Sequence, residues 1–169
     1  MSDYIEEYEF KNTPKEIKYY DDDPLKLSSE FSFYHNKSGF RKELNRLQYL
    51  FRDYLKTSLI AAGIRDSYLK EEYTEKYLIV LFTTSKNVKD TNQIIEAHSK
   101  IEIPLGCFYL KSSSEYLLLL AKDMDGLNFG IDTLEEIFTQ TFEDYFNRKK
   151  FNEHIKIRPF KMTSCTKSS

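Results

Sequence analysis

Hydrophobic and polar residues alternate in three short segments in the first part of the chain. Residues 13–20 alternate around Pro14, which cannot donate to a strand ladder and therefore suits the start of a strand. Alternation resumes at residues 25–27, after a run of three aspartates, and again at residues 30–34. The pattern predicts that the first two segments form a β-hairpin and that the third is a further strand.

Two longer stretches have the spacing of an amphipathic helix. In residues 38–62, leucines and aromatic residues recur at steps of three and four, Ser38 can cap the start, and Gly63 lies just past the end. A second helical period begins at Leu127, and we expect Asp125 to be its N-cap. The sequence therefore predicts two principal helices.

The remaining hydrophobic runs have the length of strands. Residues 77–84 are almost uninterruptedly apolar and predict a central strand, buried on both faces. Residues 106–110 and 115–121 flank a lysine and three serines and predict a hairpin, and residues 154–162 predict a closing strand. A short helix within residues 87–98 has little periodic support.

These elements predict an α+β fold, a two-layer sandwich in which a largely antiparallel sheet carries two principal helices on one face. Two helices cannot cover both faces, so we expect the second face to be free for a partner. A chain of 169 residues can bury a sizeable core, and no glycine- or proline-rich linker divides it. We therefore predict an N-terminal arm at residues 1–11, one domain at residues 12–162 and a polar tail at residues 163–169.

Composition narrows the possible partners and the compartment. A formal charge of -2 and a pI near 6.0 do not indicate nucleic acid as a partner. Cys107 and Cys165 lie far apart and match no metal-ligand or redox spacing, which predicts unpaired cysteines and a buried Cys107 in a reducing compartment.

The sequence shows neither the pattern of a secretory signal nor that of a membrane span. The first seven residues are acidic where a secretory signal would be basic, and the apolar runs of about six residues are far below the roughly 20 that span a bilayer. The sequence therefore predicts a cytoplasmic protein that does not cross a membrane.

One segment is in partial register with a calcium-binding loop. The chelating positions would be Ala121, Asp123, Asp125 and Asp132, so that the first lacks an oxygen ligand and the last is not the bidentate glutamate. The same residues suit a strand, a tight turn and a capped helix. We therefore expect no metal there.

Other candidates for chemistry are few. His35, His98 and His154 have no ligand spacing, no serine lies in a Gly-x-Ser-x-Gly elbow, and no glycine-rich phosphate loop is present. The absence of tryptophan disfavours a sugar subsite of the stacking type. The sequence predicts no catalytic residue and no cofactor.

A strand, an acidic turn and the start of a helix follow one another in residues 116–134. The conspicuous residues are Asp123, Asp125, Gly126, Gly130, Thr133 and Leu134. This run resembles the strand, turn and Gly-x-x-x-Gly-x-x-Thr-Leu helix of the non-catalytic domain that precedes the barrel in bacterial-type β-hexosaminidases and N-acetylglucosaminidases, glycoside hydrolase families twenty and eighty-four. The likeness covers about residues 12–160, and its specific part is residues 123–134.

The two glycines of this run have physical roles. We expect Gly126 to permit a sharp turn and Gly130 to let the helix backbone approach the sheet closely. Both roles concern packing, so the resemblance implies a structural motif and no catalytic residue.

The resemblance implies an accessory or scaffold domain without a complete active site. In those families the catalytic carboxylates belong to the following barrel, which needs at least about 200 residues. Residues 155–165 lack the Asp-aromatic step and the Arg-Gly that lead into it. The expected partner is such a barrel, or a protein on the uncovered sheet face.

Three other hypotheses stay open. The chain could be an autonomous protein- or glycan-binding module, or part of a carbohydrate-hydrolysing enzyme whose barrel lies outside it. A hydrolase acting alone would need two carboxylates about 5 to 9.5 Å apart in a cleft.

Overall fold

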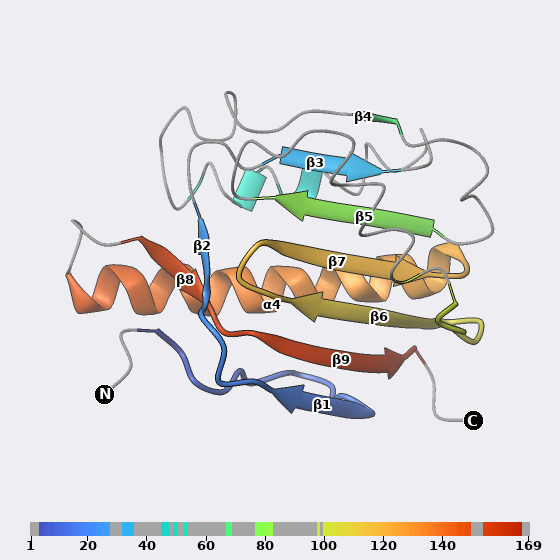
Figure 1. Ribbon diagram of the computed structural model, residues 1–169, viewed down its shortest axis with the longest axis horizontal. Helices are drawn as coiled ribbons and strands as arrows, with labels where there is room; N and C mark the ends of the chain where they lie inside the picture. Colours follow the sequence, from blue (N-terminus) through green and yellow to red (C-terminus); the bar gives the residue numbers. More distant parts are fainter. Residues whose placement is uncertain are drawn as a thin grey trace.

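The protein is an α+β sandwich of an antiparallel sheet and helices, as the sequence predicts (Figure 1). The computed structural model describes residues 4–27, 32–35, 45–47, 49–50, 53, 67–68, 77–82, 98, 100–149 and 154–166. Within this part of the chain, no helix is long and apolar enough to cross a membrane.

The main sheet has seven strands in the order β1-β9-β6-β7-β5-β3-β4. All neighbours are antiparallel except β3 and β4, which run parallel. The strands are β1 (Glu16–Tyr19), β3 (Ser32–His35), β4 (Ser67–Tyr68), β5 (Tyr77–Phe82), β6 (Cys107–Ser112), β7 (Tyr116–Ala121) and β9 (Phe160–Cys165). The hairpin of β6 and β7 and the interior position of β5 confirm the sequence predictions, while the expected burial of β5 on both faces lies outside what the structure describes. The two-residue β4 was not predicted.

A second sheet pairs β2 (Leu25–Leu27) with β8 (Ile155–Ile157). The hairpin expected at the start of the chain is therefore wrong, because β1 pairs with β9 and β2 pairs with β8. Alternation identifies a strand but not its partner. Leu25 and Leu27 are buried in the core, and they reach it beside β8 rather than beside β1.

The closing strand is also divided. Arg158 and Pro159 separate β8 from β9, since proline cannot donate to a ladder. Strand β9 then continues to Cys165, so the first three residues of the polar tail predicted at 163–169 are in fact part of the strand. Its residues alternate between buried and less buried, so this end of the chain belongs to the sheet.

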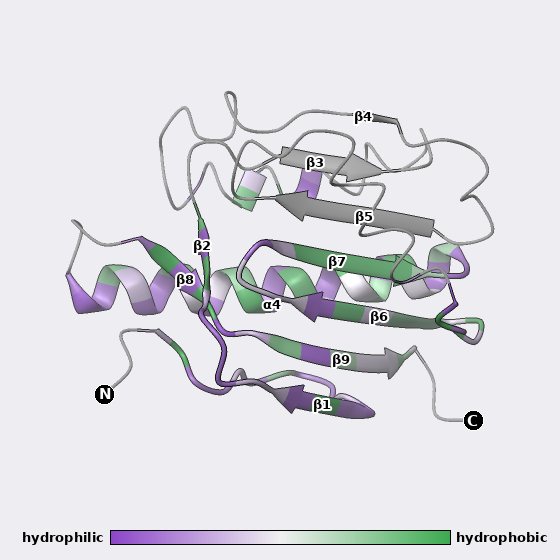
Figure 2. Cartoon of the chain, in the orientation of Figure 1, coloured by the Kyte–Doolittle hydropathy of each residue, from purple (hydrophilic) through white to green (hydrophobic). Residues whose placement is uncertain are grey.

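Helix α4 (Met124–Arg148) lies behind the sheet and packs against β6 and β7 (Figure 1). Hydrophobic residues recur along it between polar ones in Figure 2. Residues 45–47, 49–50 and 53 of the other predicted helix are helical, while its predicted cap Ser38 and the following Gly63 lie outside the described residues.

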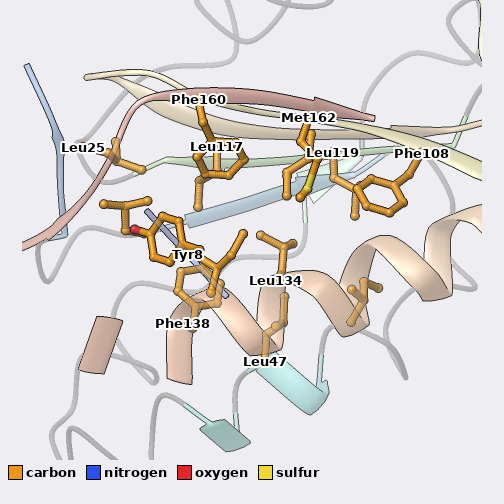
Figure 3. Packing of buried hydrophobic residues seen from close by; sticks show 14 of the residues in the cluster. Tyr8, Leu25, Leu47, Phe108, Leu117, Leu119, Leu134, Phe138, Phe160 and Met162 are labelled. Carbon is orange, nitrogen blue, oxygen red and sulfur yellow. The ribbon is translucent and has the colours of Figure 1, made fainter. Parts of the chain in front are cut away.

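The main core lies between the sheet and the helices (Figure 3). Leu47 from the first helix is fully buried in the same cluster as Leu134 of α4 and Leu119 of β7. Both helices therefore contribute to one core. The largest fully buried side chains are Phe108, Phe138, Phe142, Phe160, Leu25 and Leu47.

The opposite face of the sheet, which we call the outer face, carries a second cluster. Leu118 and Leu120 of β7 are buried there with Ile103, and Ile101 packs against them. The sequence predicted an uncovered second face. This is wrong at Tyr109 of β6 and at Leu118 and Leu120 of β7, which are buried together with Ile103 from the segment before β6.

Candidate functional site

The start of α4 is fixed by the carboxylate of Asp123. This side chain is the N-cap and accepts a hydrogen bond of 2.9 Å from the backbone N–H of Gly126. It also accepts from the N–H of Gly106, at 3.1 Å and 3.0 Å from its two oxygens. The cap is therefore Asp123 and not the predicted Asp125, because the chain becomes helical two residues earlier. Asp125 lies exposed in the first turn.

Gly126 and Gly130 lie where the helix approaches the sheet most closely. A β-carbon on Gly126 would overlap the backbone carbonyl of Cys107, and one on Gly130 would overlap the side chain of Leu119. The expectation that Gly130 faces the sheet is confirmed. Gly126 is needed for the same reason and not for a left-handed turn, since Gly106 is the only glycine with positive φ among the described residues.

The rest of the conspicuous motif also serves the fold. The hydroxyl of Thr133 donates to the carbonyl of Phe129 at 3.0 Å, and Leu134 is fully buried. Asp132, the last position of the calcium-like loop, pairs with Arg46. In the described ranges, no group of three or more His, Cys, Asp or Glu residues could hold a metal ion.

The two cysteines form a disulfide, which overturns the expectation that they are unpaired. Cys107 and Cys165 are register partners on β6 and β9, and their Cα atoms lie 3.9 Å apart. Sequence spacing could not reveal this pairing, because 58 residues separate them and only the β6–β9 ladder brings them together. Cys107 is buried, as expected.

The N-terminal arm lies along α4. The side chain of Gln140 donates to the carbonyl of Glu9 at 2.7 Å and accepts from its N–H at 2.8 Å. The N–H of Lys11 donates to Glu136 at 2.9 Å. A single amide side chain thus satisfies both backbone groups of one arm residue, as a neighbouring strand would.

Tyr8 anchors this arm in the core. Its hydroxyl accepts from the N–H of Arg158 at 3.2 Å and from Thr141 at 3.5 Å. Burial raises the pKa of Tyr8 to about 12, although these two hydrogen bonds oppose the rise. The arm predicted at residues 1–11 is therefore part of the packed structure at this point.

A hollow of about 670 Å³ lies between the arm and α4. Arg46 binds both Asp132 and Glu135 there, with 2.7 Å from its Nε to Glu135. Burial by itself lowers the pKa of Arg46, but the two carboxylates outweigh it and raise the pKa overall. The hollow is lined by Glu9, Phe10, Lys11, Asn12, Phe129, Asp132, Glu135, Glu136, Thr139 and Gln140.

A second hollow, of about 610 Å³, lies where β1 ends and β9 begins, beside the turn between β6 and β7; we call it the end hollow. Lysines, hydroxyl groups and carboxylates line it together. The residues are Tyr20, Asp22, Asp23, Tyr109, Lys111, Ser112, Ser113, Ser114, Pro159 and Lys161. None of them was singled out by the sequence, because their strands are distant in the chain.

Tyr109, one of the two tyrosines that line this hollow, is a neutral phenol at ordinary pH. Burial, followed by the nearby phenols of Tyr116 and Tyr20, raises the pKa of Tyr109 to about 12. Tyr109 is 4% exposed and also contacts His98, whose ring centroid lies 6.0 Å from its own. His98 is buried between the rings of Tyr109 and Tyr116, and among the described residues it belongs to no group of three or more His, Cys, Asp or Glu residues that could hold a metal ion.

Comparison of the chain with protein-family models, with curated proteins and with solved structures finds no match.

Proposed function

We propose that this chain is a non-catalytic accessory or scaffold domain, of the kind that precedes the catalytic barrel in hexosaminidase-type glycoside hydrolases. The observation that carries the proposal is the use of Asp123. Both of its carboxylate oxygens accept from backbone N–H groups, so the most conspicuous acid of the motif is engaged in the fold.

The other residues of the motif support the same role. Gly126 and Gly130 allow α4 to approach the sheet, Thr133 bonds within the helix, and Leu134 belongs to the core. A segment used in this way positions a helix on a sheet. It gives a rigid body to which a catalytic domain or another protein can attach.

An assay of turnover tests the proposal. The chain is incubated with a chromogenic N-acetylglucosaminide, and we expect no product above a buffer blank. Glu135→Gln and Glu136→Gln are the matched variants, because both acids line the hollow beside the arm. Product release that either substitution abolishes would show that the chain is itself a hydrolase.

An autonomous interaction module is the second candidate. It is favoured by the end hollow, which groups charged and hydroxyl side chains from three separated parts of the chain. The apolar part of the outer face at Leu118 and Leu120 is covered by Ile101 and Ile103, so a partner would meet this polar region and not a bare apolar sheet.

A further inference from the structure

Three lysines lie opposite one another on neighbouring strands, and we call them the lysine row. Lys161 of β9 is the register partner of Lys18 of β1 and also of Lys111 of β6. Residues directly opposite on antiparallel strands have β-carbons about 4.5–5.5 Å apart, and like charges in such pairs destabilise a sheet. The row therefore opposes folding, and a ligand with negative charge would relieve that repulsion.

The lysine row lies on the outer face. Phe160 and Met162, which flank Lys161 on β9, are buried in the core on the side of α4. Because side chains alternate along a strand, Lys161 points to the other face. Phe108 and Leu110 place Lys111 on the outer face by the same argument.

The ammonium groups of the row are not neutralised within the described part of the chain. None of the three has a carboxylate oxygen within 4.0 Å there. Lys18 lies 5.4 Å from the ring centroid of Tyr20, and Lys161 lies 5.9 Å from that of Tyr109. An aromatic ring attracts a cation without cancelling its charge, so the row remains positive.

Two members of the row, Lys111 and Lys161, line the end hollow. Asp22 and Asp23, both exposed, also line it, and Ser114 adds an exposed hydroxyl. A ligand with negative charge throughout would meet the two carboxylates and be repelled. A neutral, hydroxylated molecule that carries one anionic group fits both the lysines and the aspartates. The ammonium groups pair with the anion, and the carboxylates accept hydrogen bonds from the hydroxyl groups.

We propose that the end hollow binds an anionic sugar, a hydroxylated ring that carries a phosphate or sulfate group. Lys111 and Lys161 hold the anionic group, and Asp22 and Asp23 accept hydrogen bonds from ring hydroxyls. The neutral phenol of Tyr109, held on the same face, adds no negative charge to the hollow. This site does not depend on the scaffold role, and it requires no turnover of the sugar.

Calorimetric titration of the full chain tests the proposal with four probes: glucose 6-phosphate, glucose 6-sulfate, glucose and inorganic phosphate. At least one of the two esters is expected to bind about tenfold more tightly than glucose and inorganic phosphate, a factor that equals about 1.4 kcal/mol. The comparison of the two esters identifies the anionic group. Equal affinity for inorganic phosphate and both esters would overturn the role of the sugar ring, and no binding of either ester at millimolar concentration would overturn the site.

Substitutions of the two lysines test whether they contact the anionic group. Lys111→Gln combined with Lys161→Gln is expected to weaken binding of the sugar ester by about tenfold or more. Lys26→Gln is the matched control, since Lys26 is an exposed strand lysine of the small sheet and its replacement changes the net charge by one. The loss of affinity is compared per charge removed. If Lys26→Gln weakens binding as much per charge as the double variant does, only the net charge matters and the site is overturned.

A second double variant tests the two aspartates without changing any residue of the sheet. Asp22→Asn combined with Asp23→Asn alters two exposed residues outside any strand. The preference for the sugar ester over inorganic phosphate is expected to fall by about tenfold, while inorganic phosphate binds at least as well as before. An unchanged preference would overturn the role assigned to the two aspartates.

Discussion

The carboxylate of Asp123 and the backbone N–H of Gly106 are joined by a hydrogen bond of 3.0 Å, which ties the start of α4 to the turn before β6. Asp123→Ala would remove this bond and the helix cap together. An N-cap contributes about 1 kcal/mol, and the part-buried N–H of Gly106 would lose its partner, at a cost below the roughly 1–3 kcal/mol of a fully buried donor. We therefore expect the free energy of unfolding to fall by about 1–3 kcal/mol, measured by urea melts.

Asp125→Ala is the control for this prediction. Asp125 lies exposed in the first turn of α4, where a negative charge contributes less than about 1 kcal/mol through the helix dipole. A larger loss for Asp125→Ala than for Asp123→Ala would contradict the assignment of the cap.

Gly126→Ala and Gly130→Ala should both destabilise the protein, in a set order. At an exposed helix position the same change would stabilise by about 0.5–1 kcal/mol. Overpacking costs about 1–3 kcal/mol, and we expect Gly126→Ala to lie at the upper end because it meets the carbonyl of Cys107. Gly130→Ala meets the side chain of Leu119, which can shift, so its cost should be smaller. Urea melts that reverse this order would contradict the prediction.

A double mutant tests the contact between Gly130 and Leu119. Leu119→Val removes the two δ-methyl groups, one of which lies 3.1 Å from the place of an added β-carbon. We expect Gly130→Ala to cost less in the Leu119→Val protein than in the wild type. The coupling should be at least about 0.5 kcal/mol, and additive effects would show that the two residues do not pack together.

Tyr8 should make stability fall in alkaline solution. Its pKa is about 12 in the folded protein, against about 10 for an ordinary tyrosine. Below about pH 10 both states keep the proton, and between about pH 10 and 12 only the folded state keeps it. The free energy of unfolding should therefore fall by about 1.4 kcal/mol per pH unit in that window.

Tyr8→Phe isolates this contribution. The variant loses the acceptor for the N–H of Arg158, so it should be less stable than the wild type near neutral pH. Urea melts at about pH 9 and about pH 11 should show a smaller loss for the variant, because its residue 8 does not titrate. Equal losses in both proteins would show that Tyr8 titrates alike in the folded and unfolded states.

The disulfide should stabilise the fold because it lowers the conformational entropy of the unfolded chain. It closes a loop of 58 residues between Cys107 and Cys165, for which loop entropy predicts about 4 kcal/mol. Thermal melts of Cys107→Ser with Cys165→Ser, compared with the oxidised wild type, should show this loss. The reduced wild type serves as the control, and a melting temperature unaffected by reduction would contradict the prediction.

The sequence predicted most elements that are set by local pattern. Apolar runs of strand length identified β5, β6 and β7, and the helical period identified α4. Gly130 could be placed on the sheet-facing stripe because helical spacing fixes which residues share a face. Its neighbour Leu119 could not be identified, since spacing does not specify what lies opposite.

The errors all concern contacts between distant segments. Alternation in residues 13–27 suggested a hairpin, but β1 and β2 pair with strands more than 100 residues away. A β-strand offers the same backbone groups to any neighbour, so the partner is chosen by the whole packing arrangement. The N-cap was misplaced for a related reason, because Asp123 is selected by its additional bond to Gly106.

The sequence by itself determined the fold class and the hydrophobic faces, because these follow from periods of two and 3.6 residues along the chain. Only the tertiary structure decided the disulfide, the anchoring of the arm by Tyr8 and the end hollow. Lys18, Lys111 and Lys161 show the reason. They are unremarkable in the sequence, and they form a row only because the ladders of β1, β9 and β6 place them opposite one another.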